Sequence, residues 1–430
     1  MPRTSRFFFL GALFLGVLLA CRATANAQTV FDQLPQTIPG YDARFGIPLL
    51  TRAQTRLRDL GIDLGPVSVL PAVEAGIGYD SNVRGSAHAQ GSAIAATQAT
   101  LGIQRDDPGL MLGGAVQIND RRYLDTPEQS HTNWSASLGG AMQLGGGTLT
   151  VAAAHLALHQ ERTDLDALPS DTPVGFQMDD IRASYSYRFN RLTLVPNIEF
   201  TIYRFANTSI FGIPASQAYR DRNAARGGIS GRYELSPANG LLFALRTVET
   251  RYVQTAPGAP SRNSTDGVML VGVDSGEGEM WRYSVLAGMQ TRHFSAPQFQ
   301  ARTVPVADAQ LLWQPSGLTS VSLRLTRAIE DAAQESLVST VATRARLVVE
   351  HEYARDFVVQ VSGGAQAAEY SGSTRTSLNF GARALWVVNP NMRLSLSYDF
   401  TRWREGILDT TPQDGMRLRN LAMATLRLTP

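Results

Sequence analysis

Long stretches of the chain alternate apolar and polar residues with a period of two. In residues 393–400 every second residue is apolar or aromatic and the others are polar, and 181–189 and 321–325 follow the same pattern. Successive side chains of a β-strand point to opposite faces, so each stretch predicts a strand with one apolar and one polar face. About 18 such segments lie between Pro66 and Leu428, many well beyond the usual length of roughly five or six residues.

The connections between these segments fall into two classes. One class consists of short turns rich in glycine, proline and asparagine, such as 106–109 and 389–391. The other class is mostly longer and polar, and it comprises 81–90, 121–130, 161–175, 205–221, 255–263, 293–301, 329–335, 369–374 and 404–414. Short turns at one end and longer loops at the other are typical of outer-membrane barrels, whose apolar outer face is covered by lipid.

The sequence therefore predicts an all-β fold over residues 66–430, a transmembrane antiparallel up-and-down β-barrel of about 18 strands, with 16 as the alternative. An even strand number places both ends of the barrel on the periplasmic side. A barrel of this size is wide enough for an aqueous channel. Loops 161–175 and 205–221 are long enough to fold inward and constrict it, and the sequence does not decide which of them does so.

Residues 1–27 have the features of a cleaved secretory signal peptide. Arg3 and Arg6 precede an apolar run over 7–20, and Ala25-Asn26-Ala27 is an A-x-A cleavage pattern. A rival interpretation treats 18–21 as a lipoprotein box with lipid on Cys21, and both interpretations take the protein out of the cytoplasm. Residues 28–65 lack the alternation and form an N-terminal segment in the periplasm or at the lumen edge, with a short helix predicted over 50–60.

Composition and spacing exclude several kinds of function. All 39 basic residues are arginine and Cys21 is the single cysteine, which excludes a disulfide framework and a cysteine-based zinc module. Cleavage after Ala27 leaves 36 of the 39 arginines against 37 acidic residues, a balance that argues against a nucleic-acid partner. His155 and His159 lie about 13 Å apart on a strand, too far for one metal ion. We predict no enzyme activity, no catalytic residues, no cofactor and no metal site.

The alternation also assigns faces to individual residues. If the apolar positions face lipid, the polar positions between them line the lumen: Arg182, Arg188, Glu199, Tyr203, Arg232, Glu234, Arg246, Arg282, Arg324, Arg393 and Asp399. Aromatic residues with outward parity near the strand ends predict girdles at the two membrane interfaces: Tyr79, Trp134, Tyr187, Tyr233, Trp281, Trp313 and Trp386. Arginine is frequent in the lumen set, and a row of arginines can favour anionic solutes.

Short patches of sequence resemble an outer-membrane β-barrel porin family of Gram-negative bacteria. They are 78–83 at the exit of the first strand, 39–42 upstream, and Gly46. The resemblance implies a protein of the bacterial outer membrane that often accompanies exopolysaccharide or capsule export. Its implied partners are outer-membrane lipid and lipopolysaccharide, the barrel assembly machinery and a periplasmic polysaccharide export protein.

Three functions follow from this architecture and resemblance. The first is a channel that serves as a conduit for exopolysaccharide secretion. The second is a diffusion porin for small hydrophilic solutes. The third is a non-conducting barrel with a plugged lumen that serves structure or adhesion.

Overall fold

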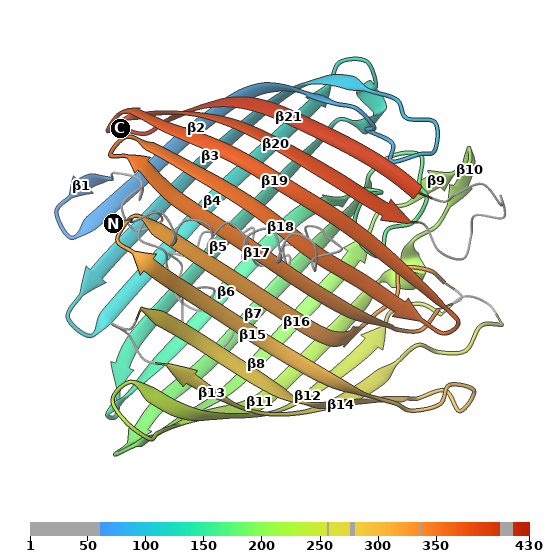
Figure 1. Cartoon of the computed structure of the whole chain (residues 1–430). Helices are drawn as coiled ribbons and strands as arrows, with labels where there is room; N and C mark the ends of the chain where they lie inside the picture. The colour runs from blue at the N-terminus through green and yellow to red at the C-terminus, as the bar shows by residue number, and fades with distance from the viewer. Residues whose placement is uncertain (1–60, 256–257, 276–279, 336, 405–415) are drawn as a thin grey trace, which may run out of the picture.

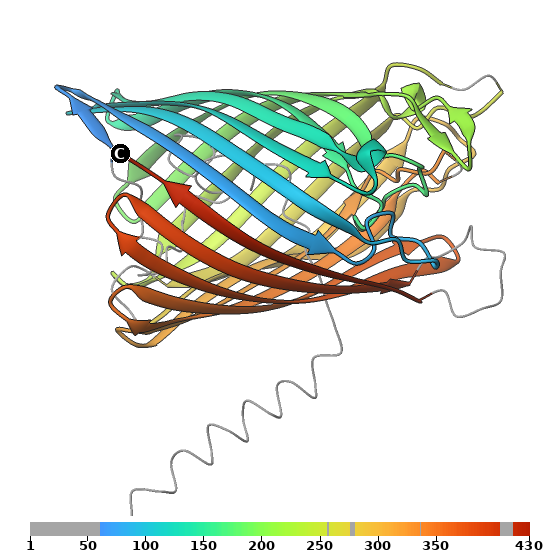
Figure 2. The same ribbon diagram turned by 90° about the horizontal axis from the view of Figure 1, so that it is seen from above.

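Eighteen long antiparallel strands follow one another along the chain and close into a barrel (Figures 1 and 2). The computed structural model describes residues 61–255, 258–275, 280–335, 337–404 and 416–430. The strands are β2 (Val67–Asp80), β3 (Ser92–Asp107), β4 (Leu110–Tyr123), β5 (His131–Leu144), β6 (Gly147–Gln160), β7 (Val174–Phe189), β8 (Leu192–Phe205), β11 (Arg222–Glu234), β12 (Asn239–Tyr252), β13 (Ser264–Ser275), β14 (Trp281–Phe294), β15 (Arg302–Ser316), β16 (Thr319–Glu330), β17 (Thr340–Ala354), β18 (Phe357–Tyr370), β19 (Ser373–Asn389), β20 (Met392–Arg404) and β21 (Met416–Leu428).

The barrel closes where the last strand pairs with the first. Residues 73–80 of β2 pair with 421–428 of β21, and the two strands lie side by side in Figure 2. The predicted 18-stranded barrel is therefore confirmed, and the alternative of 16 strands is excluded. The start of β2 and the end of β21 lie at the end of the barrel that carries the short turns, here called the turn side.

Each strand has an apolar outer face and a more polar inner face. On β2 the large side chains of Val73, Ile77 and Tyr79 are exposed outward, whereas Asp80 on the other parity is fully buried. Register partners in neighbouring strands share a face, so the parity of one strand fixes the next. On the turn side, positive φ angles at Gly109 and Asn190 permit the tight hairpins. Inside, toward the other end, Leu156 and Met178 anchor a small apolar cluster.

Several short elements lie on the loop side of the barrel, which is the end opposite the short turns. They are η2 (Pro127–Gln129), the hairpin of β9 (Thr208–Ile210) and β10 (Ile213–Ala215), and η3 (Ala218–Arg220). Within the described residues, no helix is long and apolar enough to cross a membrane.

Two local predictions are wrong. Residues 369–374 do not form a longer loop, because Tyr370 pairs with Ser373 across a tight turn in which Gly372 has φ 94°. The strand predicted over 336–353 begins only at Thr340, because the residues before it belong to an inward loop. Of the predicted N-terminal segment 28–65 the structure describes only residues 61–65, in which the short strand β1 (Ile62–Leu64) turns at Gly65 and pairs with β2. The placement of this segment stays a prediction.

Other predictions concern residues outside the described part of the chain. They are the signal peptide over 1–27 with Cys21, the helix over 50–60, the upstream family patch over 39–42 with Gly46, and most of loop 404–414. These stay predictions.

Gly288 occupies a close approach between β14 and β13, and its replacement tests the register. A Cβ atom there would lie 1.8 Å from the carbonyl oxygen of Met269. Gly288→Ala is therefore expected to destabilise the barrel by about 1–3 kcal/mol, measured as the urea midpoint for loss of the heat-modifiable gel band. The matched control is Gly267→Ala, whose Cβ would meet no atom within 4 Å. Equal midpoints for the two variants would contradict the register.

Candidate functional site

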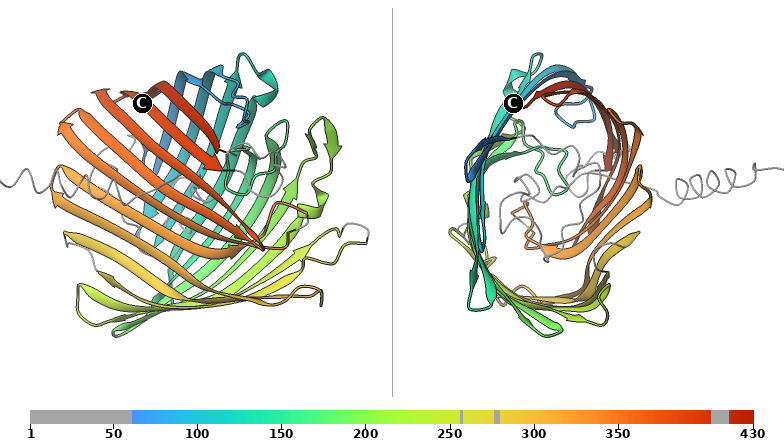
Figure 3. Two further views of the ribbon diagram at one scale, coloured as in Figure 1. Left: turned by 45° about the vertical axis from the view of Figure 1, so that its right-hand side comes forward. Right: turned by 90° about the vertical axis from the view of Figure 1, so that its left-hand side faces the viewer.

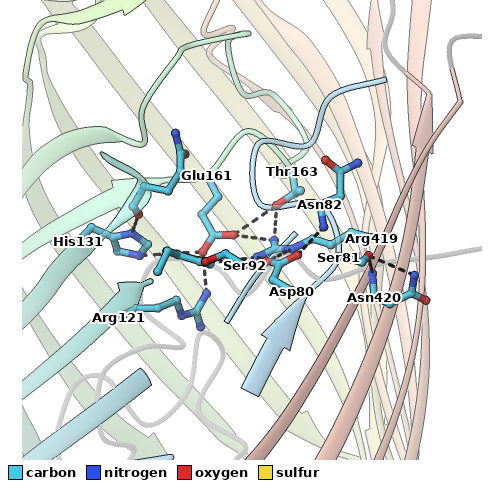
Figure 4. A network of polar contacts seen from close by, with 12 residues as sticks. Asp80, Ser81, Asn82, Ser92, Arg121, His131, Glu161, Thr163, Arg419 and Asn420 are labelled. Atoms are coloured by element: carbon cyan, nitrogen blue, oxygen red, sulfur yellow. Dashed lines mark hydrogen bonds and ion pairs between the residues drawn. The ribbon is translucent and has the colours of Figure 1, made fainter. Parts of the chain in front are cut away.

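A buried ionic network joins the barrel seam to the first inward loop (Figure 4). Arg419 on β21 donates from Nε to Asp80 Oδ2 at 2.8 Å and from Nη1 to Glu161 Oε2 at 2.8 Å. Arg121 on β4 donates to the other oxygen of Glu161 at 2.9 Å. The Asp80 side chain is fully buried and that of Arg419 is 9% exposed. The root of loop 161–173 is therefore tied to both strands that close the barrel.

The surroundings shift the pKa values of the two carboxyl groups at the start of this loop in opposite directions. Burial alone would raise the pKa of Glu161, but the charges of Arg419 and Arg121 outweigh it and hold that pKa well below its usual range. Burial and the nearby charge of Glu161 raise the pKa of Asp164 to about 7. The loop thus holds a fixed carboxylate and, three residues on, a group that titrates near neutrality.

A second ionic network holds the loop 331–339 on the other side of the mouth. Arg292 on β14 forms a bidentate pair with the buried Asp266 on β13, at 2.7 and 2.8 Å. Its remaining nitrogen donates to Asp331 Oδ1 at 2.8 Å, and Arg222 contacts Asp331 Oδ2 at 2.9 Å. Burial would raise the pKa of Asp331, yet Arg292 and Arg222 lower it overall.

The two loops meet across the mouth of the barrel, and we call the pair the mouth plug; it consists of 161–173 and the described residues of 331–339, which are 331–335 and 337–339. Asp166 accepts a hydrogen bond from the Ala333 amide at 2.5 Å and another from the Tyr370 hydroxyl. Leu165 and Ala332 pack together in an apolar cluster with residues of β17 and β18. Figure 3 (right) shows both loops inside the ring of strands.

Further contacts fix the plug to the wall. Arg375 on β19 donates to the carbonyl oxygens of Ala167 and Arg162, each at 3.0 Å. The hydroxyl of Tyr219 in η3 donates to the Ala333 carbonyl at 2.8 Å. Of the two loops predicted as candidates, 161–173 crosses the mouth and 206–221 supports it, while 331–339 supplies the part that the sequence prediction missed.

Asp164 is expected to make the plug sensitive to pH. Its pKa of about 7 in the folded loop lies above the ordinary 3.8, so the folded state binds the proton more tightly than the unfolded state. The contribution of this group to loop stability is therefore highest below about pH 4 and falls as the pH rises through 7. Hydrogen exchange of loop 161–173, corrected for intrinsic rates, should accelerate from about pH 4 to 7 and level off above that. Asp164→Asn should reduce the acceleration and leave the part that comes from Asp166, whose pKa burial also raises. An unchanged profile in the variant would contradict the assignment.

Several residues predicted to line the lumen take part in ion pairs along β7 to β13. Arg182 donates to Asp180 at 2.9 Å and lies 3.8 Å from Glu199, which also binds Arg226 at 2.5 Å. Arg232 contacts Asp274 at 2.7 Å and Glu234 at 3.2 Å.

The other predicted lumen residues share this inward parity. Arg188 binds Glu234 at 2.7 Å, and the ring of Tyr203 lies 4.2 Å beneath the Arg222 guanidinium. The remaining five lie on β12, β14, β16 and β20: Arg246, Arg282, Arg324, Arg393 and Asp399. Their role in lining a pore stays a prediction.

The aromatic residues predicted for the girdles lie on the opposite parity. Five of them have side chains that are 41–55% exposed: Tyr79, Trp134, Tyr233, Trp281 and Trp386. Trp313 stacks on Trp281 with ring centroids 4.9 Å apart, and Tyr187 contacts Phe189 at 4.3 Å. Their contact with a membrane interface also stays a prediction.

The histidines pair with different partners. His155 lies 2.6 Å from Asp179 on the outer face, whereas His159 contacts Asn133 at 2.9 Å. In the part of the chain that the structure describes, no group of three or more His, Cys, Asp or Glu side chains could hold a metal ion.

Sequence reasoning missed the residues that build the mouth: Asp80, Glu161, Asp266, Arg292, Asp331 and Arg419. Four of them carried a usable signal, because strand parity directs their charged side chains inward close to the loop end of the barrel. Glu161 and Asp331 lie in loops, where strand parity gives no direction.

Comparison with known proteins identifies a protein family that the chain matches. A family model described as Putative beta-barrel porin 2 matches residues 57–412. No curated protein matches the chain.

Solved structures resemble the chain at low identity. The FrpB iron transporter from Neisseria meningitidis (F5-1 variant) aligns with a TM-score of 0.46 at 10% identity, over 83% of this chain and 65% of that one, less than two thirds of its length. OpdK from Pseudomonas aeruginosa with vanillate gives 0.44 at 9% identity, over 84% and 99%. OccK2 (OpdF) from the same organism, in complex with glucuronate, gives 0.44 at 12% identity, over 84% and 98%.

Proposed function

The chain belongs to the putative beta-barrel porin 2 family and is a channel of the bacterial outer membrane, and on that premise we propose that it is a conduit for exopolysaccharide secretion. The observation that carries the proposal is the hydroxyl- and amide-rich inner face of β18 to β21. Inward side chains there include Gln360, Asn379, Ser397 and Thr401. Such groups can exchange hydrogen bonds with a carbohydrate chain as it passes, and transport of this kind requires no catalytic residue.

The hydroxyl face is continuous between neighbouring strands. The Ser395 and Thr425 hydroxyls lie 2.6 Å apart on β20 and β21, and Arg383 donates to Ser395 at 3.3 Å. A row of this kind offers a moving sugar many equivalent partners, so no single site traps it. Passage of a polymer also requires the mouth plug to move aside. Each loop of the plug is anchored to the barrel wall by its own ionic network, so each loop has a fixed base about which it can move.

A second candidate is a diffusion porin for small hydrophilic solutes. The observation that favours it is the contact of Asp166 with Ala333 and Tyr370, which narrows the mouth. Small solutes could pass around such a constriction without displacing it.

Polymer secretion in a deletion strain separates these functions. We expect the strain to lose surface and released exopolysaccharide, with plasmid-borne wild-type protein restoring both. The purified protein in planar lipid bilayers supplies the second readout. Conductance together with normal secretion would overturn the conduit and favour the diffusion porin. A folded, heat-modifiable protein with no conductance, in a strain that secretes normally, would leave only the non-conducting barrel.

A further inference from the structure

An apolar groove lies on the outer surface of the barrel wall. It has a volume of about 600 Å³ and crosses the sheet from β3 to β8. The small outward residues Gly114, Ala136 and Ala153 line it on β4, β5 and β6. The groove also touches Ala115 and Ala154, which have the inward parity, so it reaches down to the main chain between the outward side chains.

Large apolar side chains stand at the two ends of the groove. They are Leu101 and Ile103 on β3, and Phe200 and Ile202 on β8. Leu101 lies six positions from the turn-side end of β3, whereas Ile202 lies three positions from the loop-side end of β8. The groove therefore rises obliquely from the middle of the wall toward the loop side.

A polar pair interrupts the apolar surface at the loop-side edge of the groove. His155 Nδ1 on β6 lies 2.6 Å from Asp179 Oδ1 on β7, and the two side chains are 32% and 54% exposed. Trp134 stacks on His155 with ring centroids 4.8 Å apart. Ionisable side chains on the lipid face of a barrel destabilise it, most strongly near the membrane midplane. A polar group of a bound lipid would relieve this cost.

Hydrogen-bond donors continue from the pair toward the loop side. Gln177 is the next outward residue after Asp179 on β7, and it is the register partner of Arg204 on β8. Arg204 is held by Asn223 Oδ1 at 3.1 Å and by the Tyr203 carbonyl oxygen at 2.7 Å. Its positive charge therefore has a fixed place on the outer surface.

The charges at this end suit a head group that both donates and accepts hydrogen bonds. Two other acids nearby are engaged: Asp120 with Arg122 at 2.5 Å, and Asp221 with the Phe205 amide at 2.7 Å. His155 takes only the Oδ1 oxygen of Asp179. A ligand in this place would therefore donate to Asp179 and accept from Arg204.

The outer wall of an outer-membrane barrel is surrounded by lipid, and an open apolar groove fits an acyl chain. We propose that the groove binds the lipid A portion of lipopolysaccharide, a phosphate-bearing lipid with amide-linked, hydroxylated acyl chains. One acyl chain lies in the groove, its amide or hydroxyl group donates to Asp179, and the phosphate accepts from Arg204 and Gln177. The site is on the outside of the wall and does not depend on what the channel carries.

Added lipid A tests the groove through the stability of the purified protein in detergent. It should raise the midpoint temperature for loss of the heat-modifiable band in a saturable way. Ala153→Leu fills the groove and should require about tenfold more lipid A for the same shift, the factor expected for loss of roughly two buried methylene groups. The matched control is Ala287→Leu, at an exposed outward position on β14, which should respond like the wild type.

Removal of the phosphate tests the head-group end. Arg204→Gln should require about tenfold more lipid A, as expected for loss of a charge-assisted hydrogen bond, and should respond to dephosphorylated lipid A like the wild type. The matched control is Arg122→Gln, because Arg122 is an outward arginine already paired with Asp120. Its response to lipid A should stay at the wild-type value, and inorganic phosphate alone should leave every midpoint unchanged.

Equal responses to lipid A in Ala153→Leu and Ala287→Leu would overturn the groove, as would a saturable response to inorganic phosphate alone. A wild type without a response, or Arg204→Gln with the wild-type response, would overturn the site. If Ala153→Leu gives no heat-modifiable band, Gly114→Ala replaces it. Its Cβ would lie 3.6 Å from the Ser137 carbonyl oxygen, an ordinary contact, and it should require about fourfold more lipid A, the factor for roughly one methylene group. Conductance and polymer secretion test the channel separately, because none of these substitutions has the inward parity.

Discussion

Deletion of residues 163–170, with a Gly-Gly link from Arg162 to Asp171, is expected to raise the single-channel conductance several-fold. The deletion removes Leu165 and Asp166, and with them the apolar packing and the two hydrogen bonds that join the halves of the mouth plug. It leaves Glu161 and its two arginine partners in place and removes only the Thr163 hydroxyl from the seam network. The resistance of a pore is dominated by its narrowest section, and an 18-stranded barrel is otherwise wide.

The matched control is a shortened loop on the same side of the barrel. Deletion of 297–300 from the connection between β14 and β15 removes exposed residues such as Pro297 and Gln298, and we expect the wild-type conductance. A milder variant, Asp166→Ala, keeps the loop length and should increase the frequency of large-conductance events. A conductance that stays at the wild-type value in both plug variants would mean that the loops do not limit flow.

Arg419→Met is expected to be the most destabilising single substitution considered for this chain. It leaves the fully buried Asp80 without its arginine partner and the half-buried Glu161 with Arg121 alone, and an uncompensated buried charge costs about 3–5 kcal/mol. The free energy of unfolding should fall by that amount in urea titrations of the heat-modifiable band. Hydrogen exchange of loop 161–173 should accelerate as well, because Glu161 also loses a partner.

Two comparisons make the result specific. Arg122→Met removes an exposed, outward pair with Asp120 and should cost at most about 1 kcal/mol. The double variant Arg419→Met/Asp80→Leu removes both charges of the pair and should recover part of the lost stability. If Arg419→Met and Arg122→Met were equally stable, the network at the seam would have no special role in closing the barrel.

Strand positions and strand faces were predictable because both depend on a local pattern. A period of two is present in each strand separately, so 393–400 can be read without knowledge of its neighbours. The tight turn at Gly372 was missed because the flanking residues are polar on both sides of it, and polarity alone suggests a longer loop. The positive φ of Gly372 decides the geometry, and one glycine among polar residues does not reveal it.

The mouth was not predictable from the same pattern. Asp166 and Tyr370 are 204 positions apart, and Arg419 and Asp80 are 339 apart. No local spacing connects such residues, and a loop carries no alternation that tells which way its side chains point. The sequence does show an excess of charged residues at inward parity, and this excess indicates a polar lumen. It does not indicate which charged residues form pairs.

The contact between Arg419 and Asp80 has a consequence for the order of assembly. Hairpins of neighbouring strands bring together residues close in sequence, and such contacts form early, whereas contacts across long sequence separations form late. The seam between β2 and β21 joins the two ends of the barrel, so it forms only after every other strand is in place. Glu161 receives its Arg419 partner at that same step. An incompletely assembled barrel therefore lacks one anchor of its plug, and the last pairing of the wall also completes the attachment of the loop at its entrance.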